Sequence, residues 1–186
     1  MILNDSLELF VHGLRYKEVL RHFRHSGTLA DLGSGDQPRF LHRVRGQVER
    51  CWGLDPAAMP SEDGNMTVLR SDITKRLPFD DNALDQMTIL AVLEHIDEPW
   101  TVLEECRRCL KPGGRLIATT PSRLGILVHE LMRRVGLLRD VHEDEHRDFA
   151  MSPEVLSAWL SQAGFRVETS YRFELGLNVI AVGVKP

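Results

Sequence analysis

The feature that most constrains this chain is an apolar run that leads into two closely spaced glycines, Leu29-Ala30-Asp31-Leu32-Gly33-Ser34-Gly35. The small apolar residues predict a buried strand, and the two glycines allow a tight turn with close approach of the backbone to a ligand. We expect a helix to begin near Pro38, which a first helical turn tolerates because no donor is needed there. A second apolar stretch ends in Asp55, at the separation from the glycines at which a strand presents a carboxylate to a ribose. The pattern predicts a site for a nucleotide-like cofactor.

Length and composition favour one globular domain, residues 1–186. A chain of 186 residues can bury a core that needs no disulfide or metal, and its formal charge of −4 gives no basic face for nucleic acid. The three cysteines have no framework spacing, which is typical of a reducing cytosol. Asn4, Asp5 and Glu8 stand where a signal peptide would have an apolar core, and no apolar run approaches the roughly 20 residues of a membrane span. We therefore expect a cytoplasmic protein.

Strand and helix patterns alternate along the chain. The strand candidates are Thr28–Leu32, Arg50–Leu54, Met66–Arg70, Leu84–Leu90, Arg115–Thr119, Phe165–Phe173 and Leu177–Val184. Helical patterns cover residues up to about His25, Trp100–Leu110, Leu124–Gly136 and a segment that starts at Ser152-Pro153, with Ser152 as N-cap. The alternation predicts a parallel sheet covered on both faces by helices. The connection Pro56–Asn65 is loop-like and too short for a full helix, and the short link Glu174–Gly176 predicts a hairpin with an antiparallel last strand.

Further motifs follow the glycine turn in a fixed order. They are Arg70-Ser71-Asp72-Ile73, Pro78-Phe79-Asp80-Asp81-Asn82-Ala83-Leu84-Asp85, Val92-Leu93-Glu94-His95-Ile96 and Lys111-Pro112-Gly113-Gly114-Arg115-Leu116. With the glycine turn and Asp55, this ordered set resembles the class I S-adenosylmethionine-dependent methyltransferases of the broad small-molecule group, from Thr28 to Lys185. One departure is Gln37, where many members carry a third glycine. The resemblance implies a Rossmann-like three-layer α/β sandwich. Its seven-stranded, mostly parallel sheet would have the order 3-2-1-4-5-7-6, with the last strand antiparallel.

The resemblance also implies that the chain holds S-adenosylmethionine and releases S-adenosylhomocysteine. The expected cofactor-binding residues are Asp31, Gly33, Ser34, Gly35, Asp55, Pro56, Asp72, Ile73 and Leu90. The amides of the glycine turn would lie against the methionyl part and the sugar. Asp55 would accept hydrogen bonds from both ribose hydroxyls, Asp72 would accept one from the adenine amino group, and Ile73 would cover the adenine ring. Asp31 would organise the loop through hydrogen bonds.

Methyl transfer to a hydroxyl or an acidic carbon also requires a base, and histidine suits this role because its pKa lies near neutrality. The candidates are His95, His129, His142 and His146. Of these, His95 and His146 are the catalytic candidates, with an exposed or structural histidine as the alternative for each. The N-terminal helix (1–25) and the acceptor-side segment (121–150) are expected to form a lid over a small, possibly lipid-like acceptor that carries a hydroxyl.

Two patterns suggest metal chemistry without supporting it. His142-Glu143-Asp144-Glu145-His146 spells H-E-x-x-H in a charged segment, and Cys106 and Cys109 form C-x-x-C within one helix without a second pair. We therefore expect no metal. The Asn/Asp-Pro-Pro-Tyr/Phe signature of nucleic-acid amino methylation is absent after the fourth strand candidate. Two alternatives remain. One is a partner protein that binds the cofactor without catalysis. The other is a nucleotide-dependent oxidoreductase, disfavoured because Pro38 replaces the third glycine of G-x-G-x-x-G.

Overall fold

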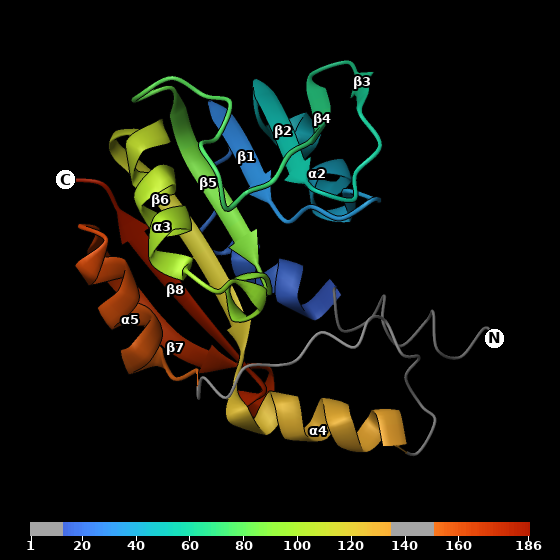
Figure 1. Cartoon of the computed structure of the whole chain (residues 1–186), viewed down its shortest axis with the longest axis vertical. Coiled ribbons are helices and arrows are strands. Elements are labelled where there is room, and N and C mark those ends of the chain that lie inside the picture. The colour runs from blue at the N-terminus through green and yellow to red at the C-terminus, as the bar shows by residue number, and fades with distance from the viewer. Residues whose placement is uncertain (1–12, 135–150) are drawn as a thin grey trace.

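The computed structural model describes residues 13–134 and 151–186, and a single sheet forms the centre of this part of the chain (Figure 1). Its eight strands follow the order β3-β4-β2-β1-β5-β6-β8-β7. The strands are β1 (Thr28–Leu32), β2 (Arg50–Asp55), β3 (Ser61–Asp63), β4 (Met66–Arg70), β5 (Leu84–Leu90), β6 (Leu110–Pro121), β7 (Arg166–Phe173) and β8 (Asn178–Val184). β4, β2, β1, β5 and β6 are parallel neighbours, whereas β8 runs antiparallel to both β6 and β7.

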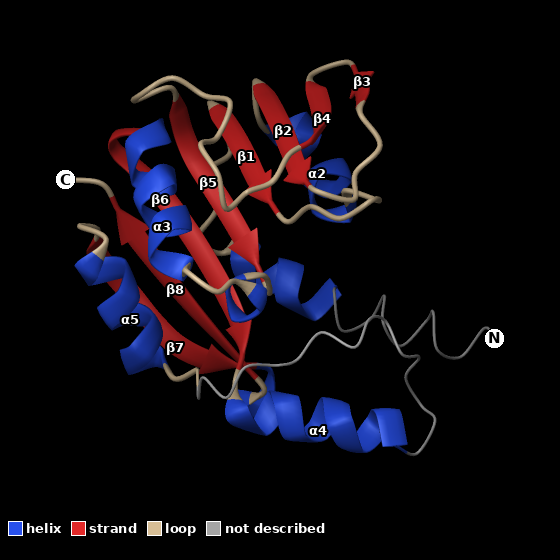
Figure 2. Cartoon of the chain, viewed as in Figure 1, coloured by secondary structure: helices blue, strands red, loops and turns tan. Residues whose placement is uncertain are grey.

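Helices and short 3-10 turns connect these strands (Figure 2). They are α2 (Arg39–Val44), η1 (Arg45–Gln47), η2 (Leu93–His95), α3 (Pro99–Cys109), α4 (Arg123–Arg134), α5 (Pro153–Gln162), η3 (Glu174–Gly176) and a helix over residues 13–20. The predicted cap of α5 is confirmed, since the Ser152 side chain accepts a hydrogen bond from the Val155 amide at 3.3 Å. Pro38 lies just before α2, and its carbonyl accepts the His42 amide at 3.0 Å.

The predicted order of the seven strands is confirmed and Pro56–Asn65 contains no helix, as predicted, but the predicted count of seven strands is wrong. That segment contains β3, an eighth strand that pairs antiparallel with β4 at the edge of the sheet. The reversal occurs at Gly64, whose positive φ of 62° suits a two-residue hairpin loop. A strand of three exposed residues has no apolar alternation, so periodicity gives no signal for it.

Apolar side chains cover both faces of the sheet. One buried cluster joins the strands to α3 and α5, through residues such as Leu103 and Leu160. The other joins them to the N-terminal helix and α2, through residues such as Val19 and Phe40. Figure 1 shows α3 and α5 in front of the sheet, with α2 behind it. This is the predicted three-layer sandwich. Its outer layers cover the two faces of the sheet, and the ends of the strands lie between these layers.

The carboxyl ends of β1, β2, β5 and β6 meet at one edge of the sheet, as parallel pairing requires. The start of β8 reaches the same edge, because Asn178 pairs with Pro121 at the end of β6. Ligands of open parallel sheets bind outside these carboxyl ends. No helix within residues 13–134 or 151–186 has the length and apolar character needed to cross a membrane.

Candidate functional site

The turn after β1 is held against the end of β2 by backbone hydrogen bonds. The amides of Gly33 and Ser34 donate to the carbonyl of Leu54 at 2.8 and 3.3 Å. Gly33 has φ +72°, and a Cβ added to it would lie 2.3 Å from Cγ2 of Val92. A side chain at this position would therefore be strained and would also clash with the loop that follows β5.

Gly35 and Asp55 form the other half of the turn. The Gly35 amide donates to Oδ2 of Asp55 at 2.9 Å, and the Ala57 amide donates to Oδ1 at 2.8 Å. Gly35 also has a positive φ, of 73°, but a Cβ added there would meet only the amide nitrogen of Gln37, at 3.9 Å. The space above Gly35 is therefore open, and it lies beside a carboxylate that two amides hold in place.

Asp31 is tied to the neighbouring strand. It is 4% exposed, and its Oδ1 accepts a hydrogen bond from the Thr88 hydroxyl of β5 at 2.5 Å. Burial raises the pKa of Asp31 to about 7; the Thr88 hydrogen bond opposes this rise, and the negative charge of Asp55 adds to it. Thr88 escapes sequence reasoning because a threonine inside a buried strand carries no distinguishing pattern.

The remaining predicted cofactor residues lie around this turn. Asp72 is exposed, and its Oδ1 accepts hydrogen bonds from the Thr74 hydroxyl at 2.6 Å and the Thr74 amide at 3.0 Å. These bonds, with Lys75 at 3.2 Å, hold the pKa of Asp72 below its usual range. Ile73 is buried, Pro56 is exposed, and Leu90 is half-buried at the end of β5.

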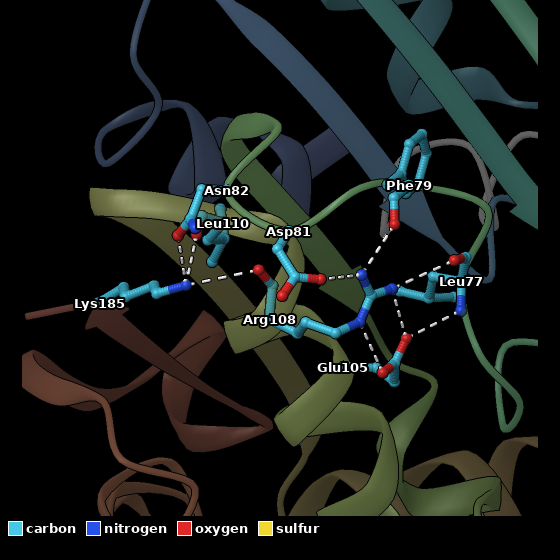
Figure 3. A network of polar contacts seen from close by, with 8 residues as sticks. All are labelled: Leu77, Phe79, Asp81, Asn82, Glu105, Arg108, Leu110 and Lys185. Atoms are coloured by element: carbon cyan, nitrogen blue, oxygen red, sulfur yellow. Dashed lines mark hydrogen bonds and ion pairs between the residues drawn. The ribbon is translucent and has the colours of Figure 1, made fainter.

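A half-buried arginine fixes the segment between β4 and β5 on α3 (Figure 3). The guanidinium of Arg108 donates to the carbonyls of Leu77 and Phe79, to Asp81 and to both carboxylate oxygens of Glu105, at 2.8–3.2 Å. Glu105 in turn accepts the Leu77 amide at 2.9 Å. Lys185 holds the other end of the same segment by donating to Asn82 at 2.9 Å. The segment that follows Ile73 is therefore anchored at both ends.

The N-terminal helix lies across the carboxyl edge. The ring of Tyr16 packs on Phe40 with centroids 5.3 Å apart; burial raises the pKa of Tyr16, and the charge of Asp31 adds to this rise. One residue earlier, Arg15 Nη2 donates to Oδ1 of Asn178 at 3.4 Å. The helix therefore reaches from the end of β1 to the start of β8, over the ends of the strands between them.

Near this edge several buried polar atoms have no hydrogen-bond partner among the described residues. They are Arg15 Nε, Glu94 Oε2, Glu174 Oε1, Thr119 Oγ1, Thr120 Oγ1 and, in the glycine turn, Ser34 Oγ. Burial raises the pKa of Glu94 to about 7 and also raises that of Glu174, and the positive charge of Arg15 opposes both shifts. Buried polar groups are normally paired, so a group of unpaired ones marks a place for a ligand or for water.

Unlike these buried polar atoms, the predicted histidines that the structure describes are exposed. His95 is exposed at the end of η2, and His129 is exposed on α4. His142 and His146 lie outside the described residues, as does the H-E-x-x-H pattern. Within the described ranges no group of three or more His, Cys, Asp or Glu side chains is placed to hold a metal.

Two further sequence features take definite places. Cys106 and Cys109 are free and buried, and burial raises the pKa of Cys109 to about 11. On the acceptor-side segment, α4 exposes Leu124, Leu127 and Leu131 to solvent.

Sequence reasoning gave no role to Arg15 or Glu94. The signal that could have found Glu94 is a carboxyl flanked by apolar residues, as in Leu93-Glu94-His95-Ile96.

Comparison with known proteins identifies the family. Residues 30–118 match the family described as Methyltransferase domain. The chain is 31% identical over 139 residues to the demethylmenaquinone methyltransferase of Clavibacter sepedonicus, which covers 67% of this chain and 56% of that protein. It is 34% identical over 92 residues to the ubiquinone biosynthesis O-methyltransferase of Xanthomonas oryzae pv. oryzae. That match covers 46% of this chain and 37% of the relative. The chain thus spans about half or less of the length of these relatives.

Solved structures agree with this match at the level of the fold. The Haloferax volcanii methyltransferase in complex with the Trm112 methyltransferase activator has a TM-score of 0.78 at 21% identity, covering 98% of this chain and 93% of that one. A SAM-dependent methyltransferase from Aquifex aeolicus has a TM-score of 0.67 at 18% identity, covering 93% and 90%. Residues 30–118 thus form a methyltransferase domain, in a fold shared with S-adenosylmethionine-dependent methyltransferases. The cofactor of this methyltransferase is therefore S-adenosylmethionine.

The glycine turn of the methyltransferase fits that cofactor. Gly35 leaves open space for close approach, and Ser34 Oγ is a buried polar atom without a partner among the described residues. A carboxylate offers about four acceptor positions, and the two amides on Asp55 use two of them. The rest could accept two ribose hydroxyls, so the donor set and the free space suit an adenosyl group.

Proposed function

We propose that this methyltransferase transfers the methyl group of S-adenosylmethionine to a small-molecule acceptor that carries a ring hydroxyl, as a quinol does. The observation that carries the proposal is the group of unpaired, buried polar atoms at the carboxyl edge, represented by Glu94, Thr119 and Thr120. Thr119 and Thr120 are adjacent in β6, so their side chains face opposite sides of the sheet, and a ring with hydroxyl groups could pair with Glu94 and with one of the two. The quinone-related names of the two relatives support this choice.

On the cofactor side, each predicted residue receives a role in the proposal. The amides of the glycine turn would lie against the methionyl part and sugar, and Asp55 would accept both ribose hydroxyls. Asp72 would turn from Thr74 and Lys75 to accept the adenine amino group, and Ile73 would cover the adenine ring. Pro56 and Leu90 would line the sugar and methionyl sides, and Asp31 would keep the turn in place through Thr88.

Methyl transfer mainly requires that the acceptor is correctly oriented toward the cofactor. When bound, S-adenosylmethionine supplies a methyl group on a sulfonium that is already a good leaving group. The chain has to hold the acceptor atom in line and exclude water, and such positioning can supply roughly 7–11 kcal/mol of barrier lowering. The N-terminal helix, through Arg15 and Tyr16, would cover the reacting groups within the single domain that we infer for residues 1–186.

Calorimetric titration with S-adenosylmethionine, S-adenosylhomocysteine and NAD is the first test. We expect micromolar binding of the two adenosyl compounds and no heat from NAD. Release of S-adenosylhomocysteine is then followed with catechols and short-chain quinols. Cofactor binding without turnover of any hydroxylated ring would contradict the proposed acceptor and favour a cofactor-binding partner protein. Binding of NAD in place of the adenosyl compounds would favour the oxidoreductase.

A further inference from the structure

Glu94 is a buried carboxyl with an unused oxygen. It lies in η2, directly after β5, and is 6% exposed between the buried side chains of Leu93 and Ile96. Oε2 has no hydrogen-bond partner in the described part of the chain. Leaving a buried polar atom unpaired destabilises the fold, so a site that keeps one usually has a use for it.

The backbone around Glu94 places it beside the site. Val92, two residues earlier, packs directly over Gly33 of the cofactor turn. Ala91 has φ +57°, and its amide donates to the carbonyl of Thr119 at 2.8 Å. The loop that carries Glu94 is therefore fixed between the β1 turn and the end of β6, where Thr119 and Thr120 also have unpaired hydroxyls.

One positive charge acts on this carboxyl. Arg15 of the N-terminal helix opposes the effect of burial on Glu94, and it also acts on Glu174 at the β7–β8 connection. Glu174 also has one unpaired oxygen, Oε1, but its Oε2 accepts the side-chain amide of Asn178 and the residue is only half-buried. Glu94 is thus the carboxyl of the pair that is nine-tenths buried and next to the cofactor turn.

We propose that Glu94 is the catalytic base of this methyltransferase, acting on an acceptor hydroxyl. The inference rests on the proposed function. The hydroxyl proton moves to Oε2 of Glu94 as an oxygen electron pair forms the new C–O bond. The S–C bond breaks, its electron pair stays on sulfur, and neutral S-adenosylhomocysteine leaves. The proton on Glu94 then passes to solvent.

The electrostatics agree with this role. Burial raises the pKa of Glu94 to about 7, and Arg15 keeps it from rising further. A base is most effective when its pKa lies near the working pH, because it is then both largely ionised and able to hold a proton. The predicted histidine, His95, is the next residue along, but its side chain is exposed.

The kinetic test compares Glu94→Gln with Glu98→Gln. Glu98 is an exposed glutamate four residues later that serves as a matched control. With a catechol acceptor, Glu94→Gln should lower kcat about 100-fold or more, leave the Kd for S-adenosylhomocysteine within about threefold and remove the rise of kcat with pH below about 7. Glu98→Gln should match wild type. A nitrocatechol, whose hydroxyl is already ionised at pH 8, should restore most of the lost rate.

A second readout needs no turnover. 4-Nitrocatechol is titrated into the S-adenosylhomocysteine complex at pH 8 by calorimetry, in two buffers of different ionisation heat. The wild type should take up about one proton on binding, because two anions brought together must share one. Glu94→Gln should take up almost none, and Glu98→Gln should behave as wild type.

The outcomes separate the two proposals. If the wild type methylates hydroxyl acceptors and Glu94→Gln keeps its rate, pH profile and proton uptake, the role of Glu94 is overturned while the proposed function stands. If the wild type binds S-adenosylhomocysteine but neither binds nor methylates any hydroxylated ring, both proposals are overturned. Unfolding curves of the two variants check that a lost rate does not come from a lost fold.

Discussion

The Gly35 amide donates to the Asp55 carboxylate across 2.9 Å, joining the turn after β1 to the end of β2. The same carboxylate is the predicted ribose acceptor, so one group both shapes the turn and would bind the cofactor. Asp55→Ala should weaken S-adenosylmethionine binding by at least tenfold, because hydrogen bonds to a charged group are worth about 1.5–3 kcal/mol. Calorimetry measures the Kd. Asp63→Asn, on exposed β3, is the control, and an unchanged Kd in Asp55→Ala would refute the assignment.

Replacing each of the two glycines of the turn by alanine should affect stability and cofactor binding differently. Both have positive φ, which costs an alanine about 1–2 kcal/mol. Gly33→Ala adds a clash with Val92, so it should destabilise the fold by several kcal/mol in urea unfolding. Gly35→Ala meets open space and should cost little beyond the strain, yet it should weaken cofactor binding because the methyl group fills that space. Equal losses of stability in the two variants would contradict this difference.

Asp31 should make stability fall as the pH rises. Its pKa is about 7 in the folded protein against about 3.9 in an unfolded chain, so between these values the folded state holds a proton that the unfolded state has released. The free energy of unfolding therefore decreases from about pH 4 to about pH 7 and is flat above. Each pH unit is worth at most about 1.4 kcal/mol for this group.

Asp31→Asn removes this dependence and serves as the test. Urea unfolding at pH 5.0 and pH 7.5 should show a smaller decrease for the variant than for wild type, by about 1–3 kcal/mol. Asp85→Asn is the control. Burial acts upward on the pKa of Asp85, but Lys111 and Thr28 hold it below its usual value, so its contribution is constant above about pH 5. The prediction fails if Asp31→Asn and wild type lose the same free energy.

Arg108 should stabilise the fold more than its neighbour does. Arg108→Ala removes the bonds to Glu105 and to the carbonyls of Leu77 and Phe79, leaving partly buried acceptors unpaired. We expect a loss of about 2–4 kcal/mol in the free energy of unfolding. Arg107→Ala, at an exposed position on the same helix, should change it by about 0.5 kcal/mol or less. Similar losses in the two variants would mean that the network contributes little.

Each of the seven strands was located from its own apolar run, and the turn chemistry at Gly33 and Gly35 marks where the chain reverses. The order of these strands followed from the family resemblance. Sequence reasoning missed β3 because three polar residues beside a glycine lack any such run. It also selected His95 as a base, from its residue type and its position after the fourth predicted strand. Burial distinguishes Glu94 from its neighbour, and burial depends on tertiary packing that no local pattern encodes.

The short strand β3 has a further consequence for how these molecules meet one another. A sheet edge offers unpaired amides and carbonyls to any passing strand, which makes it a template for aggregation. Here that edge is three residues long and exposed, with the carboxylates of Glu62 and Asp63 on it. The Asp63 carboxylate also forms an ion pair with Arg45 of the same chain. A second copy approaching this side would meet negative charge and too few free backbone groups to continue the sheet, so association through the β3 edge is disfavoured.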